Sequence, residues 1–117
     1  MSEKDDKAFI MHILDSIAAI ERFSKNLTRE KLETNRLKQS AIVREIEIIG
    51  EAVKNLSEKL RGDYPGVEWR NIVGTRDQMI HHYFGIDLDI IWGIVQKDLP
   101  LLKKKIKSIE ESLEKKP

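Results

Sequence analysis

Apolar residues recur at intervals of three and four over most of this 117-residue chain, and that spacing gathers them on one face of an α-helix. The pattern from Ile10 to Ile20 predicts a first helix over residues 4–25, which Asn26-Leu27-Thr28 ends. A second helix is predicted from there to about Leu60. Its apolar side consists of Leu37, Ala41, Ile42, Ile46, Ile49, Val53, Leu56 and Leu60, and its opposite side is a polar stripe of Ser40, Arg44, Glu47, Glu51 and Asn55.

The segment 61–66 combines glycine, aspartate and proline, and it is the clearest loop in the sequence. A shorter third helix is predicted over residues 67–82. Gly74 lies in the middle of this helix, where glycine costs about 1 kcal/mol relative to alanine. Close approach by a neighbouring helix would explain this glycine, and so would access for a ligand. The residues of this helix that are predicted to face inward are Trp69, Ile72 and Val73.

Apolar residues keep helical spacing from Leu88 to Leu113, straight through Pro100. Because the register survives the proline, one long kinked helix is predicted here, with Asp87 as its N-cap. Four helices joined by short connections predict an all-α protein, an antiparallel four-helix bundle. The second and fourth helices would each extend about 45 Å. Helices of that length would extend beyond the core of so short a chain and leave apolar residues exposed. The exposed apolar surface indicates a dimer.

Composition narrows the class of protein. The length predicts a single domain over residues 1–117, since a second core would be hard to fill. The chain has no cysteine, which excludes disulfides and thiolate metal sites. It has no apolar run of membrane-spanning length, and its first residues lack the apolar core of a signal peptide. These features predict a cytoplasmic protein without membrane association.

Charge is balanced overall but uneven along the chain. The net charge of +1 does not by itself indicate nucleic-acid binding. Residues 103–117, however, hold six lysines and three glutamates, a local charge of +3. These lysines would form the solvated face of the last helix, where cations also suit the helix dipole, or they would contact a phosphate backbone.

The densest group of chemically versatile side chains is the stretch Arg76-Asp77-Gln78-Met79-Ile80-His81-His82-Tyr83, which reads R-x-x-x-x-H-x-Y. Arg76 offers a planar cation that suits phosphate oxygens, and His81 can take and give a proton near neutral pH. Cleavage of RNA by its own 2′-hydroxyl requires deprotonation of that hydroxyl, protonation of the leaving 5′-oxygen and stabilisation of a charged phosphorus. One arginine and one histidine supply two of these functions, and a symmetric dimer could supply all three.

The position of the motif on the helix bears on this hypothesis. Residues five apart on an ideal helix are separated by about 140°, so Arg76 and His81 would share a face only where the helix is distorted. Gly85 and Asp87 predict a helix end close to His81, where such a distortion costs little. The helix dipole at that end also favours imidazolium.

The motif residues also have purely structural interpretations. Arg76 could pair with Asp77 or Glu51 on the protein surface. Tyr83 could pack beside Phe84 in a core. Either interpretation would leave the arginine and the tyrosine without a chemical role.

Histidines are commonly packed or solvated, and this interpretation applies to His82 and His12. The adjacent His81 and His82 could suggest a metal site, but neighbouring positions on a helix point apart. No third ligand has suitable spacing. The sequence therefore predicts no metal and no cofactor.

The stretch Trp69-Arg70-Asn71-Ile72-Val73-Gly74-Thr75-Arg76-Asp77-Gln78-Met79-Ile80-His81-His82-Tyr83-Phe84-Gly85-Ile86-Asp87 resembles the signature of HepT-like proteins of the HEPN superfamily. Ile48-Ile49-Gly50-Glu51-Ala52, with Arg44 upstream, resembles the second helix of that family. The similarity covers nearly the whole chain, and the spacing and the trailing tyrosine both match. It implies a single HEPN-like helical domain.

Members of this family are ribonuclease toxins of prokaryotic type VII toxin–antitoxin pairs, whose antitoxin is a minimal nucleotidyltransferase that attaches AMP to the motif tyrosine. The resemblance implies that Arg76 and His81 are the catalytic pair and that Tyr83 is the AMP acceptor. It further implies a homodimer whose two motifs meet in a cleft, and cleavage that is independent of metal. Auxiliary roles near the cleft would fall to Arg44, Glu51, Asp77 and His82.

Residues and resemblance together predict a metal-independent endoribonuclease toxin that acts on tRNA or messenger RNA. The alternative is a non-catalytic helical module that binds a nucleotidyltransferase partner or a nucleotide, and the net charge of +1 favours it. A purely structural bundle would not explain why arginine, histidine and tyrosine crowd at one helix end. A positive cleft that joins both copies of Arg76 to the lysines of residues 103–107 would support RNA binding, whereas isolated, ion-paired arginines would support the module.

Overall fold

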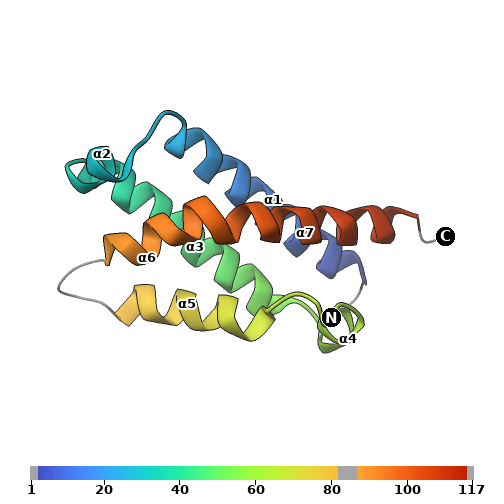
Figure 1. Cartoon of the computed structure of the whole chain (residues 1–117). Coiled ribbons are helices and arrows are strands. Elements are labelled where there is room, and N and C mark those ends of the chain that lie inside the picture. The colour runs from blue at the N-terminus through green and yellow to red at the C-terminus, as the bar shows by residue number, and fades with distance from the viewer. Residues whose placement is uncertain (1–2, 82–86, 116–117) are drawn as a thin grey trace.

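The computed structural model describes residues 3–81 and 87–115, and for residues 3, 4, 80 and 81 it describes the backbone alone. The described residues form helices and their connections, without a strand. The long helical segments run antiparallel to their neighbours, which confirms the predicted all-α class and four-helix bundle (Figure 1). These segments are α1 (Glu3–Ser24), α3 (Arg36–Asn55), α5 (Trp69–His81) and a last stretch made of α6 (Leu88–Gly93), η1 (Ile94–Asp98) and α7 (Leu99–Glu114).

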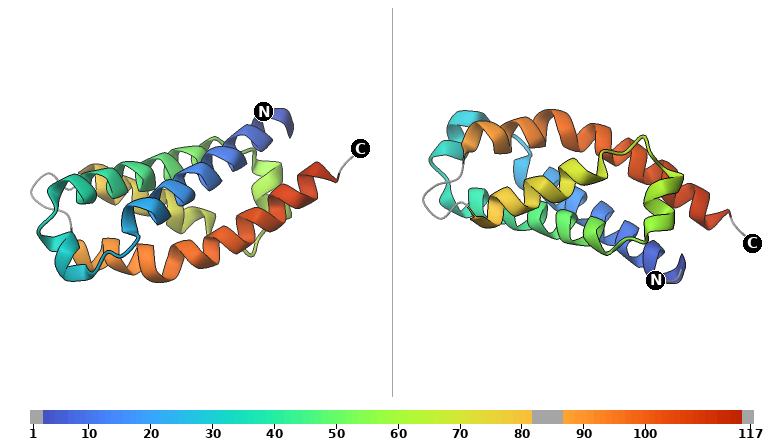
Figure 2. Two further views of the ribbon diagram at one scale, coloured as in Figure 1. Left: turned by 90° about the horizontal axis from the view of Figure 1, so that it is seen from above. Right: turned by 90° about the horizontal axis from the view of Figure 1, so that it is seen from below.

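The helices surround one apolar core. Figure 2 shows α3 and α7 on opposite sides of the bundle, with α1 and α5 between them. α3 packs against both α1 and α5, and α7 packs against α1. The isoleucines predicted on the inner side of the first helix are buried, as are most of the apolar residues predicted for the second and the last. Fully buried members of the core include Ile10, Ile13, Ile17, Ile20, Ile42, Val53, Ile91, Ile106 and Ile109.

The prediction of one unbroken second helix up to Leu60 is wrong. Two short helices, α2 (Arg29–Glu33) and α4 (Glu58–Asp63), flank α3 in its place. Asn35 accepts a hydrogen bond from a backbone N–H in the first turn of α3 at 3.0 Å, and Ser57 does the same for α4 at 3.1 Å. Because both side chains cap a new helix start, the chain breaks at each of them.

Two smaller differences follow from these breaks. Leu37, predicted on the buried side, is 80% exposed because it lies in the first turn of α3 at the end of the bundle. The predicted loop 61–66 begins three residues later than expected, since α4 covers its first half. The indole N–H of Trp69 donates to the backbone carbonyls of Arg61 and Tyr64, at 3.2 and 3.0 Å, and thereby ties this connection to the start of α5.

The last helix runs continuously through Pro100, as predicted, and its distortion takes the form of the π-helical segment η1. The backbone N–H of Leu99 donates to the carbonyl of Ile94, five residues earlier. Such a wider turn accommodates a proline, which has no N–H to donate and crowds the preceding turn. Asp87 accepts hydrogen bonds from two backbone N–H groups in the first turn of α6, at 3.0 and 3.3 Å, so the predicted N-cap is confirmed.

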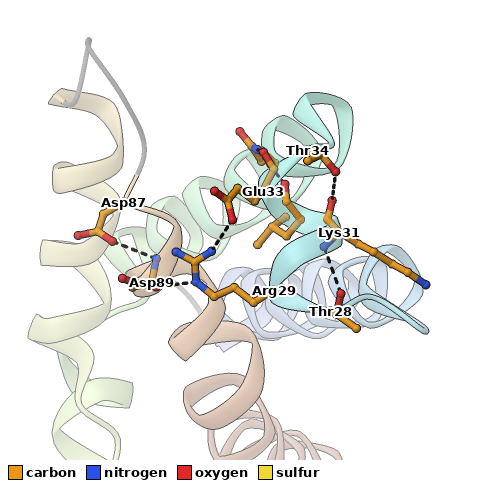
Figure 3. A network of polar contacts seen from close by, with 9 residues as sticks. Thr28, Arg29, Lys31, Glu33, Thr34, Asp87 and Asp89 are labelled. Carbon is orange, nitrogen blue, oxygen red and sulfur yellow. Dashed lines mark hydrogen bonds and ion pairs between the residues drawn. The ribbon is translucent and has the colours of Figure 1, made fainter.

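A polar network holds the start of α6 against α2 (Figure 3). Arg29 donates from Nε to Asp89 at 2.6 Å and pairs with Glu33 at 3.3 Å. The hydrogen bond to Asp89 raises the pKa of the Arg29 guanidinium above its ordinary value, and both carboxylates add to the effect. α2 therefore anchors the helix that follows residues 82–86 in the chain.

Asp6 on α1 is a buried carboxylate, 4% exposed, that supports the N-cap of α4. It accepts hydrogen bonds from the backbone N–H and the hydroxyl of Ser57, at 2.8 and 2.6 Å. Asp6→Ala should lower the free energy of unfolding by about 1.5–3 kcal/mol, the usual value of hydrogen bonds to a charged group. Urea unfolding measures this loss. Asp15→Ala, at an exposed position of the same helix, is the control, and equal losses in both variants would contradict the role of Asp6.

Candidate active site

The side chain of Arg76, on α5, lies against α3 at Gly50, which has no side chain of its own. A Cβ atom placed on Gly50 would overlap the Cβ of Arg76 and lie 2.7 Å from its Cγ. α3 therefore needs glycine at this position for the arginine to occupy its place. Gly74 differs, because a Cβ there would meet nothing within 4 Å. Close approach of a neighbouring helix, one of the two explanations predicted for Gly74, is therefore wrong, and such an approach occurs at Gly50 instead.

The guanidinium of Arg76 is held by two carboxylates. Its Nη2 atom pairs with Oε2 of Glu51 at 2.9 Å, and its Nη1 atom pairs with Oδ1 of Asp77 at 3.1 Å. The sequence suggested Glu51 or Asp77 as the ion-pair partner of Arg76, and the structure pairs Arg76 with both. The arginine side chain is 22% exposed, and its Nε is buried without a hydrogen-bond partner among the described residues. Arg76 is thus oriented at its tip, and its Nε–H remains without an acceptor among those residues.

Arg76 forms one wall of a polar pocket with a volume of about 320 Å³. The floor of the pocket is the polar stripe of α3, and the opposite wall belongs to α1. The predicted auxiliary residues Arg44 and Glu51 both line it, so the structure places them beside Arg76, while their roles stay predictions. The lining residues are Phe9 and His12 from α1, Arg44, Glu47, Ile48, Glu51, Ala52 and Asn55 from α3, and Arg76 from α5.

The other motif residues lie at or after the last described residue of α5, which is His81. The helix end predicted close to His81 therefore stays a prediction. The side chain of His81, together with His82 and Tyr83, lies outside the described residues. Their predicted roles as catalytic, auxiliary and AMP-accepting residues therefore stay predictions.

Two aromatic residues of the pocket received no functional role from the sequence. His12 was interpreted as a packed or solvated histidine, and Phe9 was not singled out. Their rings stand perpendicular, at 89°, with centroids 5.9 Å apart. The spacing of three residues indicates a shared helix face, but it does not say which helix that face meets. That information comes only from the packing of α1 against α3.

The lysines of the last helix do not join the pocket in one protomer. Among the described residues that line the pocket, none belongs to α7. Lys103 pairs with Glu21 at 2.9 Å, and Lys105 donates to the backbone carbonyl of Gly66 at 2.8 Å. Within the described part of a single chain these lysines therefore do not line the Arg76 pocket, and a positive cleft that joins two copies of Arg76 with residues 103–107 would have to form in a dimer.

Among the described side chains, those of residues 5–79 and 87–115, no group of three or more histidine, aspartate or glutamate residues is arranged to hold a metal ion. No helix of the same part of the chain is both long and apolar enough to cross a membrane.

A sequence profile described as "Ribonuclease HepT-like" matches residues 13–109. The chain belongs to the HepT-like family. This HepT-like protein is 40% identical over 114 residues to a Methanocaldococcus jannaschii protein named "Putative RNase MJ0127", and the match covers 97% of the chain and 94% of the relative. It is 33% identical over 109 residues to the "Probable ribonuclease HepT" of Thermococcus cleftensis, with 93% and 99% covered.

A second Methanocaldococcus jannaschii protein, named "Gamma-glutamylcyclotransferase and putative RNase MJ0434", is 44% identical over 112 residues. The match covers 96% of the HepT-like chain, which spans 50% of the length of that relative. No solved structure matches the chain. The family resemblance read from residues 69–87 and 44–52 is confirmed.

Proposed function

We propose that this HepT-like protein is an endoribonuclease and that Arg76 and His81 are its catalytic pair. The observation that carries the proposal is the placement of Arg76, whose stem lies against Gly50 and whose guanidinium is oriented by Glu51 and Asp77 at a polar pocket. An oriented guanidinium suits the oxygens of a phosphodiester. Relatives that carry ribonuclease names support the same conclusion.

In the proposed reaction, the 2′-oxygen of the RNA attacks the adjacent phosphorus while the bond to the 5′-oxygen breaks. His81 takes the proton of the 2′-hydroxyl or supplies one to the leaving oxygen, and Arg76 donates hydrogen bonds to the charged non-bridging oxygens. The products are a 2′,3′-cyclic phosphate and a 5′-hydroxyl. One proton leaves the 2′-oxygen and one joins the 5′-oxygen, so the reaction consumes no co-reactant. Glu51 and Asp77 are 52% and 53% exposed, so either carboxylate has room to yield its place on the guanidinium to a phosphate.

We further propose that the active form is a homodimer in which the two motifs face each other across a cleft. One histidine per chain cannot both remove and supply a proton in a single step, whereas two copies can. Helix length supports a dimer less strongly than the sequence suggested, because α3 measures only about 30 Å. The argument from length now rests on the last helix, which extends about 40 Å. Exposed apolar side chains that a partner copy would cover include Leu37, Ile90 and Leu101.

Regulation by a cognate nucleotidyltransferase antitoxin, with Tyr83 as the AMP acceptor, completes the proposal of a type VII toxin. An adenylated Tyr83 would add bulk and a negative phosphate close in sequence to Arg76 and His81, and both would exclude RNA. We expect Tyr83→Phe to retain most of the cleavage activity and to stay active after incubation with the nucleotidyltransferase and ATP. RNA cleavage before and after that incubation measures both properties. A folded, dimeric Tyr83→Phe protein without activity would contradict a role limited to accepting AMP.

The second candidate function is a non-catalytic module that binds a nucleotidyltransferase or a nucleotide. The ion pairs of Arg76 with Glu51 and Asp77 favour it, as does the engagement of Lys103 with Glu21. Incubation of the purified protein with bulk tRNA and messenger RNA separates the two, provided that mass spectrometry shows Tyr83 free of AMP. RNA fragments would support the ribonuclease, whereas intact RNA would support the module.

A further inference from the structure

Phe9 and His12 give the α1 wall of the Arg76 pocket an aromatic surface. Phe9 is half-buried and packs against the core, which fixes its ring. His12 is exposed and stands perpendicular to it, with centroids 5.9 Å apart. An edge-to-face pair of this kind is a favourable arrangement that holds the outer ring in place. The pocket therefore offers the exposed ring of His12, which is held in place by the ring of Phe9.

This aromatic wall lies across α3 from Arg76. α3 packs against α1 on one side and against α5 on the other, and axes of packed helices lie about 8–10 Å apart. Phe9 and His12 therefore line the wall of the pocket opposite Arg76. They lie where a neighbouring nucleotide would extend if a strand crossed α3. The surface between the two walls belongs to α3, whose polar residues there are Arg44, Glu47, Glu51 and Asn55, beside Ile48 and Ala52.

We propose that Phe9 and His12 form a stacking site for one base of single-stranded RNA, whose neighbouring phosphate binds at Arg76. This inference rests on the proposed ribonuclease function and names how its substrate is held. Every base has a π-face, so stacking on an aromatic side chain binds single strands with little sequence preference. The pocket volume of about 320 Å³ lies at the lower end of the range for small-ligand sites, as expected for a single nucleotide.

The polar floor suits the rest of such a nucleotide. Arg44, whose side chain is 70% exposed, can reach a backbone phosphate, and its ion pair with Glu47 is long at 3.7 Å. The carboxylates of Glu47 and Glu51 accept hydrogen bonds, which the exocyclic amino groups of bases donate. Aromatic, cationic and acceptor groups thus occur together in one pocket, in the combination that single-stranded RNA requires.

RNA binding can be measured without cleavage in a His81→Ala background, by fluorescence anisotropy of a short labelled oligoadenylate. Adding His12→Ala should weaken binding by about 5- to 150-fold, the usual effect of removing one stacking ring. Adding His12→Phe should keep the affinity, because the ring remains. Met11→Ala is the matched control, since Met11 is the adjacent, 55% exposed residue and does not line the pocket. If His12→Ala bound RNA as tightly as Met11→Ala does, the stacking site would be wrong.

Two further ligands separate this inference from the function on which it rests. An abasic ribose-phosphate strand of equal length should bind His81→Ala more weakly than oligoadenylate and should be insensitive to His12→Ala. Equal affinity for both strands would overturn the stacking site and leave the ribonuclease intact, whereas binding of neither strand would overturn both. Free AMP should bind far more weakly than the strand. If it bound as tightly, and through His12, the pocket would be a mononucleotide site and the RNA assignment would be wrong.

Discussion

His81→Ala should lower the rate of RNA cleavage by about 100- to 10,000-fold, which is the usual contribution of a side chain that transfers a proton in the transition state. Alanine cannot take or give a proton, so the attacking and leaving oxygens lose their proton partner. Single-turnover cleavage of a labelled RNA measures the loss, and circular dichroism checks that the variant remains helical.

The adjacent histidine provides the matched control for this result. His82→Ala removes an imidazole one residue further along, and we expect it to lower the rate by less than about tenfold, a smaller effect than proton transfer contributes. If the two variants lost activity equally, the assignment of the proton-transferring role to His81 would not hold. The same conclusion would follow if His81→Ala kept more than about a tenth of the activity.

Gly50→Ala should damage both the active site and the fold. The added Cβ would overlap the Cβ of Arg76, so either the arginine must leave its place between Glu51 and Asp77 or α3 and α5 must separate. Overpacking of this kind costs about 1–3 kcal/mol of stability. Displacement of a catalytic group by about 1 Å can cost roughly 100-fold in rate. We therefore expect cleavage to fall by about 100-fold even where the variant is folded.

Gly74→Ala tests whether the effect at Gly50 comes from packing. It places the same methyl group on α5, where nothing lies within 4 Å, and removes a flexible residue from a helix interior. Its stability should rise by up to about 1 kcal/mol. Urea unfolding and cleavage assays of both variants give the comparison. Cleavage at the wild-type rate by Gly50→Ala would show that the contact with Arg76 does not hold the site together.

Helical periodicity was sufficient to predict the bundle and most of its core, but not the ends of the second helix. Leu56 and Leu60 keep the apolar spacing of α3 although a break at Ser57 separates them, and both are buried. The break is set by hydrogen bonds of Ser57, two of which it donates to Asp6, 51 residues away in the chain. A contact of such separation leaves no trace in a local pattern.

The candidate site could be predicted only in part, for a similar reason. The polar stripe of α3 identified Glu51 as a partner for Arg76, because charge alone suggests that pair. The close contact at Gly50 depends on which residue of α5 lies opposite, and the sequence does not contain that information. Phe9 and His12 were missed because their face of α1 becomes part of the site only through its packing beside α3.

Analysis of the RNA ends tests the central claim most directly. Purified protein with AMP-free Tyr83 is incubated with bulk tRNA and messenger RNA in EDTA, and the 3′ ends of the fragments are determined by mass spectrometry. The proposed reaction predicts 2′,3′-cyclic phosphates from the wild type and none from Arg76→Ala or His81→Ala. Intact RNA with the wild-type protein, or fragments that end in a 3′-hydroxyl, would contradict cleavage by the 2′-oxygen at Arg76 and His81.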